Sequence, residues 1–174
     1  MTEEELYILL DSWENIEIVT QELSHSPEKF GILMNIALNK SEQRSWRAAY
    51  LADKIHDDFP GLLKPYLPDI IKKLKIEKNA SKRRHWLKLI SMNKIDPQYS
   101  GFLVDYCLNA FTSAKEAVAV RVHAMQILFN ISEIEPGLKP ELLAVIEHEM
   151  EYHSTAGILS RGSKLAKQLH KQIK

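Results

Sequence analysis

The chain has 174 residues, of which 45% are hydrophobic and 26% are charged, as in an ordinary soluble protein with one hydrophobic core. Its 23 basic and 23 acidic residues cancel. This balance excludes the long-range positive field of a dedicated nucleic-acid or anionic-membrane binder, so any such role needs a local patch. The single cysteine, Cys107, excludes an intrachain disulfide and, in its apolar stretch, is expected to be a buried hydrophobe. We therefore expect a cytoplasmic protein. The acidic start MTEEELYILL is neither a secretory signal nor a membrane span.

Apolar residues recur at steps of three and four along almost the whole chain, and no segment shows sustained alternation between apolar and polar residues. This pattern predicts an all-helical protein. The first predicted helix covers residues 3–23, with a break near Asp11 and Ser12. We expect the segment 1–25 to act as an N-terminal cap that covers the open face of the helices after it.

Four helical pairs are predicted after this cap, and turn residues mark their limits. Ser26 followed by Pro27 is a helix start, and so is Asp96 followed by Pro97. Ser81 is expected to cap one further helix, and the segment 113–116 is read as a capping box for another. The last helix is expected to begin at about Thr155. The predicted pairs occupy residues 27–59, 62–92, 97–131 and 138–174, and we expect one domain over 1–174.

Arginines stand at equal intervals of 37 residues at positions 47, 84 and 121, each at the start of a predicted helix. A period of this length is typical of a solenoid of helical pairs. One such pair cannot bury its apolar face alone, so neighbouring pairs must stack on one another. The sequence is therefore more informative about architecture than about activity.

The segment Val120–Leu128 resembles the Val-Arg-x-x-Ala-x-x-x-Leu pattern that opens the second helix of a HEAT repeat. Leu67–Ile71 resembles the proline-containing first helix of that repeat. The pattern departs from the family where Arg83 precedes Arg84 and where Gly162 follows Arg161. The resemblance implies an all-α, right-handed α-α superhelix of the HEAT-like, armadillo type, with about four hairpins. It also implies a scaffold or adaptor role, with the arginine-bearing helices on the concave face.

The arginine ladder, defined as Arg47, Arg84, Arg121 and Arg161, has two explanations. A guanidinium at each helix start can bind carbonyls and carboxylates of the adjacent repeat and hold the stack together, which is the reading we favour. Alternatively, a row of guanidinium groups matches a peptide or nucleic-acid backbone with regular negative charge. Trp46 and Trp86 stand beside two of these arginines. Core packing is their default role, but partial exposure in the groove would make them binding anchors.

Charge is distributed unevenly along the chain. Residues 1–28 contain eight acidic residues and no lysine or arginine, whereas residues 72–88 contain eight basic residues against one acid. Such runs are usually solvated faces, but this one crosses a hairpin and should form a compact patch. We expect four of its members to be solvent exposed and to be candidates for binding an acidic partner: Lys72, Lys73, Lys82 and Arg83.

No catalytic or metal-binding signature is evident. His148 and His153 superficially resemble a zinc-protease helix, but they are five residues apart instead of four, and Tyr152 occupies the required position. Nucleotide-binding glycine motifs and a nucleophile elbow are missing from the sequence. We therefore predict no enzyme activity, no catalytic residues, no metal site and no cofactor.

Three classes of function remain open. The leading one is a non-enzymatic module that docks another protein or peptide of acidic character on its groove or basic ridge, with no membrane partner. The second is nucleic-acid binding, as in the HEAT-like alkylpurine DNA glycosylases, for which Asp53 or Asp57 would be the nearest guess for an acid. The third is head-to-tail self-assembly through the acidic N-terminal and basic C-terminal ends.

Overall fold

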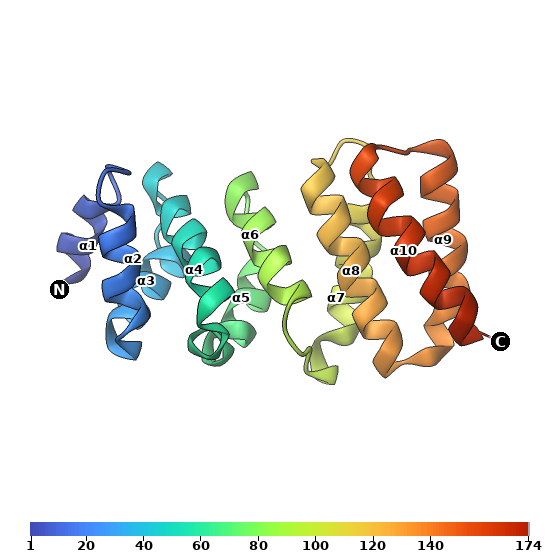
Figure 1. The fold of residues 1–174 in the computed structure, drawn as a ribbon, viewed down its shortest axis with the longest axis horizontal. Coiled ribbons are helices and arrows are strands. Elements are labelled where there is room, and N and C mark those ends of the chain that lie inside the picture. The colour runs from blue at the N-terminus through green and yellow to red at the C-terminus, as the bar shows by residue number, and fades with distance from the viewer. Residues whose placement is uncertain (174) are drawn as a thin grey trace. The chain divides into compact units, whose positions relative to one another are not determined.

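A computed structural model describes residues 1–173, and within them every regular element is helical, as predicted. Figure 1 shows the succession of helices along the chain. Short 3-10 turns precede several of them, at 43–45, 60–62, 64–66, 97–99 and 136–138. The α-helices are α1 (Glu3–Leu9), α2 (Ile16–Ser24), α3 (Pro27–Asn39), α4 (Trp46–Asp58), α5 (Leu67–Leu74), α6 (Ala80–Ser91), α7 (Ser100–Thr112), α8 (Val118–Ile134), α9 (Lys139–Tyr152) and α10 (Ala156–Ile173).

The chain divides into two compact units, and the boundary falls inside α6. Unit 1 is Met1–Leu89, and unit 2 begins at Ile90. The predicted pairs 27–59, 97–131 and 138–174 correspond to α3 with α4, α7 with α8, and α9 with α10, and the helices of each pair pack together. The predicted pair 62–92 contains α5 and α6. Within the described residues, no helix is both long and apolar enough to cross a bilayer.

The first predicted helix is two helices, because the chain breaks where the sequence suggested. Helix α1 begins with a capping box in which Thr2 Oγ1 accepts from the Glu5 N–H at 3.2 Å and Glu5 accepts from the Thr2 N–H at 2.8 Å. It ends before Leu10 and Asp11, whose carbonyls accept hydrogen bonds from the Arg47 side chain. A guanidinium therefore satisfies backbone acceptors that a continuous helix would have used itself.

The helix starts agree with the sequence at some positions and differ at others. Ser26 caps α3, with Pro27 in the first turn, and Asp96 caps the 3-10 turn that leads into α7. Ser81 was the wrong cap for α6, because Asn79 Oδ1 accepts from the Lys82 N–H at 3.0 Å. The expected capping box at 113–116 was also wrong. Helix α8 begins only at Val118, and its N-cap makes no side-chain hydrogen bond.

Each unit has its own apolar core. In unit 1 the fully buried side chains include Leu23, Phe30, Leu33, Met34 and Leu51. In unit 2 they include Leu103, Cys107, Phe111, Ile127 and Ile158.

Helices α9 and α10 approach closely at Gly162, which is buried. A Cβ on this residue would lie 2.6 Å from Sδ of Met150. This glycine therefore has a packing function that offsets its poor helix propensity.

Candidate functional site

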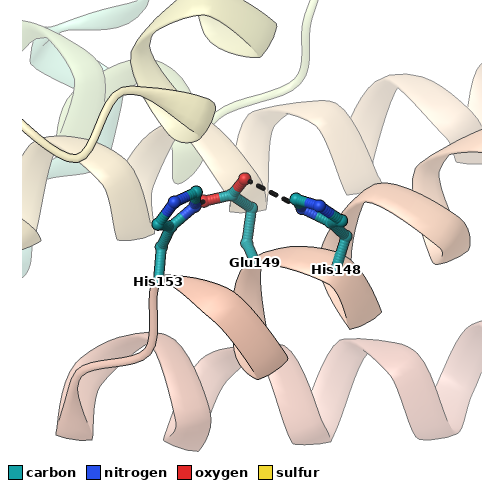
Figure 2. Close-up of side chains that lie close together, drawn as sticks. All are labelled: His148, Glu149 and His153. Atoms are coloured by element: carbon teal, nitrogen blue, oxygen red, sulfur yellow. Dashed lines mark hydrogen bonds and ion pairs between the residues drawn. The ribbon is translucent and has the colours of Figure 1, made fainter.

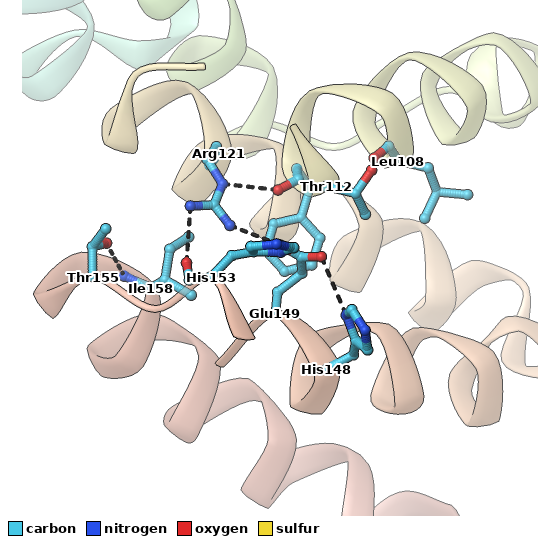
Figure 3. A network of polar contacts seen from close by, with 9 residues as sticks. Leu108, Thr112, Arg121, His148, Glu149, His153, Thr155 and Ile158 are labelled. Atoms are coloured by element: carbon cyan, nitrogen blue, oxygen red, sulfur yellow. Dashed lines mark hydrogen bonds and ion pairs between the residues drawn. The ribbon is translucent and has the colours of Figure 1, made fainter. Parts of the chain in front are cut away.

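Arg121 lies at the centre of a buried network in unit 2 (Figure 3). Its side chain is 3% exposed. Its Nε donates to the Phe111 carbonyl at 2.9 Å and its Nη1 donates to the His153 carbonyl at 3.1 Å. Its Nη2 donates to Glu149 Oε2 at 2.9 Å, and that carboxylate is also buried. One guanidinium thus joins the end of α7, the start of α8 and the end of α9.

The other three arginines of the ladder differ in environment. Arg47 is partly buried, and its Nη1 lies 2.6 Å from the carbonyls of both Leu10 and Asp11. Arg161 Nη1 donates to Gln126 Oε1 at 2.6 Å, from α10 to α8. Arg84 is exposed. The contacts of Arg47, Arg121 and Arg161 support the structural reading of the ladder, whereas Arg84 faces solvent.

The two tryptophans beside the ladder have different exposures. Trp86 is fully buried, which agrees with the default of core packing and removes it as a candidate binding anchor. Its indole belongs to the core of unit 1 because α6 turns that face inward. Trp46 is half-buried and lies 5.8 Å from Trp13 between ring centroids, with the Arg47 guanidinium 4.9 Å from the Trp13 ring. Trp46 and Arg47 line a surface hollow of about 600 Å³ near the end of α1.

Lys82 is only 2% exposed, so the prediction that it faces solvent was wrong. Because Asn79 caps α6, Lys82 lies in the first turn of this helix, and its side chain extends toward the end of α3. Its Nζ donates to the Lys40 carbonyl at 2.6 Å. Lys40 is the C-cap of α3. Its carbonyl is therefore one of the last carbonyls of the helix, which have no hydrogen-bond donor within the helix. Burial lowers the pKa of Lys82 below its ordinary value.

Lys82 lines a hollow of about 310 Å³ between the end of α3 and the connection from α5 to α6. We call it the basic hollow, because its lining includes four lysines and one acid, namely Lys40, Lys73, Lys78, Lys82 and Glu77. The Lys40 ammonium is paired with Glu3 at 3.2 Å, and Glu77 accepts from the Asn79 N–H. Among residues 1–173, no carboxylate oxygen comes within 4.0 Å of the ammonium groups of Lys73, Lys78 or Lys82. The hollow therefore has an excess of positive charge.

The remaining members of the predicted basic patch lie nearer the surface. Lys72 is exposed, as predicted, and Lys73 and Arg83 are half-buried. The patch is thus partly a solvated face and partly the wall of the basic hollow.

Asp53, His85 and Lys88 form a polar centre in unit 1 that the sequence did not reveal. Asp53 Oδ2 lies 2.7 Å from His85 Nδ1, and Asp53 Oδ1 accepts from Lys88 Nζ at 2.7 Å. Burial raises the pKa of Asp53, but the hydrogen bonds from His85 and Lys88 outweigh it and hold that pKa below its ordinary value. Asp53 is therefore a carboxylate at neutral pH and is unsuited to donate a proton as a general acid. Asp57 is exposed, 3.9 Å from Lys88.

His148, Glu149 and His153 lie together at the end of α9 (Figure 2). His148 Nδ1 is 3.5 Å from Glu149 Oε1, and His153 Nδ1 is 3.0 Å from Glu149 Oε2. The five-residue spacing would keep the two histidines apart only in a helix that continues through His153. Helix α9 ends at Tyr152, and the non-helical backbone of His153, with φ −134° and ψ 38°, lets its ring turn back to Glu149.

One useful signal was already in the sequence. The predicted helix start at Thr155 is confirmed by Thr155 Oγ1, which accepts from the Ile158 N–H at 3.3 Å. A helix start at this point places His153 in the preceding connection.

A family model described as a HEAT repeat domain matches residues 8–169 of the chain. Comparisons with curated proteins and with solved structures give no significant match.

Proposed function

The chain belongs to the HEAT repeat family, and we propose that it is a non-enzymatic module that binds an acidic segment of another protein. Members of this family generally serve as protein-interaction scaffolds. The proposed docking surface is in unit 1 and consists of the basic hollow and the surface lysines and arginines around it. We also propose a cytoplasmic location, which is supported by the single, buried cysteine.

The observation that carries this proposal is the buried ammonium of Lys82. Among the described residues, the only hydrogen-bond acceptor of this ammonium is the backbone carbonyl of Lys40, at the end of α3. The dipole of a helix supplies about half a negative charge at its C-terminus, which compensates an ammonium only in part. A buried charge without a full counter-ion is costly, so Lys82 should favour an incoming anion.

A carboxylate side chain is the anion that suits the geometry best. The hollow of about 310 Å³ is at the small end of the usual range for ligand pockets and has room for one or two acidic side chains. Lys73 and Lys78 stand at the same hollow and add attraction that weakens with salt. Asp or Glu residues on an extended or helical peptide would supply the matching charge.

Nucleic acid is the alternative partner. A single-stranded nucleic acid would also be attracted by the basic patch. The protein as a whole is neutral, however, which does not favour long-range attraction to a polyanion. In the glycosylase version of this alternative, Asp53 would have to act while both of its oxygens are engaged by His85 and Lys88.

The test is fluorescence anisotropy with a labelled acidic peptide, with single-stranded DNA of equal charge as competitor. The double variant Lys73→Gln with Lys78→Gln removes two charges at the hollow. The matched control, Lys164→Gln with Lys167→Gln, removes two exposed charges from α10 in unit 2. We expect the first variant to weaken peptide binding about tenfold at low salt, and less at high salt, with the control unchanged.

Two results would overturn the proposal. Equal loss in both double variants would show that binding follows net charge instead of the hollow. Preferential displacement of the peptide by single-stranded DNA would favour the nucleic-acid alternative.

A further inference from the structure

The arrangement at the end of α9 points to a divalent transition-metal site in unit 2. We propose that His148, Glu149 and His153 bind Zn²⁺ or a similar ion through two imidazole nitrogens and one carboxylate oxygen. Candidate ligand atoms of the three residues all lie within 4.8 Å of one another. This site is separate from the basic hollow and does not depend on the proposed docking function.

The distances are close to those of a coordinated ion. Zinc binds histidine nitrogen and carboxylate oxygen at about 2.0 to 2.2 Å, so two ligands of a tetrahedral ion are about 3.3 Å apart. The two histidine nitrogens lie 3.5 and 3.0 Å from Glu149 oxygens. Both rings are substantially exposed, with 58% and 42% of their side-chain surface accessible, so small ring rotations can bring the nitrogens onto one ion.

The chemistry of the donor set narrows the choice of metal. Imidazole suits zinc, copper and nickel, whereas magnesium and calcium prefer sites built from oxygen atoms alone. Two histidines and one glutamate occupy three positions of a tetrahedral ion, and the exposure of the rings leaves the fourth to water.

Arg121 is the group that faces this site from the interior. Its Nη2 donates to Glu149 Oε2, and its Nη1 donates to the carbonyl of His153 (Figure 3). Arg121 therefore fixes the carboxylate of one proposed ligand, Glu149, and the backbone of another, His153. Ligating carboxylates are commonly oriented by such hydrogen bonds. The positive charge of Arg121 also opposes a cation, so the site should bind zinc less tightly than a closed structural site does.

The proposed site has a structural consequence within unit 2. His148 and Glu149 belong to α9, whereas His153 lies in the connection to α10. A bound ion would therefore fasten the start of this connection to the end of α9. Zinc should raise the thermal midpoint of unit 2, because a ligand that binds only the folded state stabilises it.

The experiment is calorimetric titration of the full chain with Zn²⁺, together with thermal unfolding in the presence and absence of the ion. His148→Ala and His153→Ala, singly and together, remove surface ligands while Glu149 keeps its partner Arg121. The matched control is His25→Ala, an exposed histidine in unit 1. We expect each single variant to bind Zn²⁺ at least about tenfold more weakly, because mutation of a residue that only hydrogen-bonds a metal ligand already lowers affinity this much. The double variant should lose saturable binding.

Cobalt gives an independent readout of coordination. Co²⁺ bound to two imidazoles and a carboxylate should give visible absorption bands that the double variant lacks, and Mg²⁺ should not compete for the site. The proposal is overturned if Zn²⁺ binds the wild type and the double variant equally, or if it gives no saturable heat with the wild type. In either case the three residues serve only as an ion-pair network around Arg121.

Discussion

Each unit buries a basic residue near the start of a helix, but the two cations have different partners. In unit 2, Arg121 is held by the Glu149 carboxylate and two backbone carbonyls. In unit 1, Lys82 has one carbonyl and no carboxylate within 4.0 Å among the described residues. The arginine is nearly saturated by its own chain, whereas the ammonium keeps unused donors.

This difference in partners, and not position in the repeat, distinguishes the structural role of Arg121 from the binding role proposed for Lys82. Arg84 is the ladder member that corresponds to Arg121 by spacing, yet it is exposed, and the buried cation of α6 stands two residues before it. A cation that is satisfied within the fold holds elements together. One that is incompletely satisfied beside a hollow is available for a ligand.

The largest expected effect tests the structural half of this comparison. Arg121→Met removes the arginine partner of the buried Glu149 carboxylate and leaves it only its contacts with His148 and His153. Removal of one partner of a buried pair typically costs about 3 to 5 kcal/mol of unfolding free energy. Urea unfolding measures this loss. Arg84→Met, at the exposed position, should change stability by less than about 0.5 kcal/mol.

A second variant makes the first result specific. Arg121→Met combined with Glu149→Leu removes both charges, and it should recover much of the lost stability because no uncompensated ion remains. If Arg121→Met unfolds no more easily than Arg84→Met, the network in Figure 3 is not the main support of the α8 start.

An intermediate effect is expected at Asp53, the other buried ion-pair centre. Asp53→Asn weakens the hydrogen bonds to His85 and Lys88 and should cost about 1 to 3 kcal/mol at neutral pH. The pKa of Asp53 is below its ordinary value of 3.8 in the folded protein. Its contribution is therefore complete above that value and is lost as pH falls through the lower folded pKa.

The corresponding measurement is the stability difference between wild type and Asp53→Asn as a function of pH. It should be constant near neutrality and shrink below about pH 4. A difference that grows on acidification would mean that Asp53 is raised, not lowered, in pKa.

The smallest expected effect tests the binding half of the comparison. Lys82→Met removes the hydrogen bond to the Lys40 carbonyl but also relieves a buried charge, so the two contributions oppose each other. We expect a net change below about 1 kcal/mol in thermal or urea unfolding. A loss as large as that of Arg121→Met would show that Lys82 chiefly serves to hold the end of α3 to α6.

The sequence was most informative where local signals suffice. The periodicity identified the helices, and Ser26 and Asp96 marked helix starts correctly because their cap bonds span only two or three residues. Asn79 and Ser81 are both good caps, so local preference could not choose between them. That choice decides whether Lys82 faces solvent or the end of α3.

The candidate sites were less predictable because they depend on distant segments. Lys82 meets a carbonyl 42 residues earlier, and His85 meets Asp53 across 32 residues. The fully buried state of Trp86 also comes from this tertiary packing. The histidine group at the end of α9 is different, because the predicted start at Thr155 already implied that His153 is not helical.

Cys107 allows the motions of one unit to be followed separately. It is fully buried in α7, and burial raises the pKa of its thiol, so the reactive thiolate is suppressed in the folded state. A thiol reagent can therefore modify the chain only when this part of unit 2 transiently opens. Because the chain has a single cysteine, the rate of labelling reports how often unit 2 opens and is not affected by the opening of unit 1. Zinc and an acidic peptide can then be compared by how far each one slows that rate.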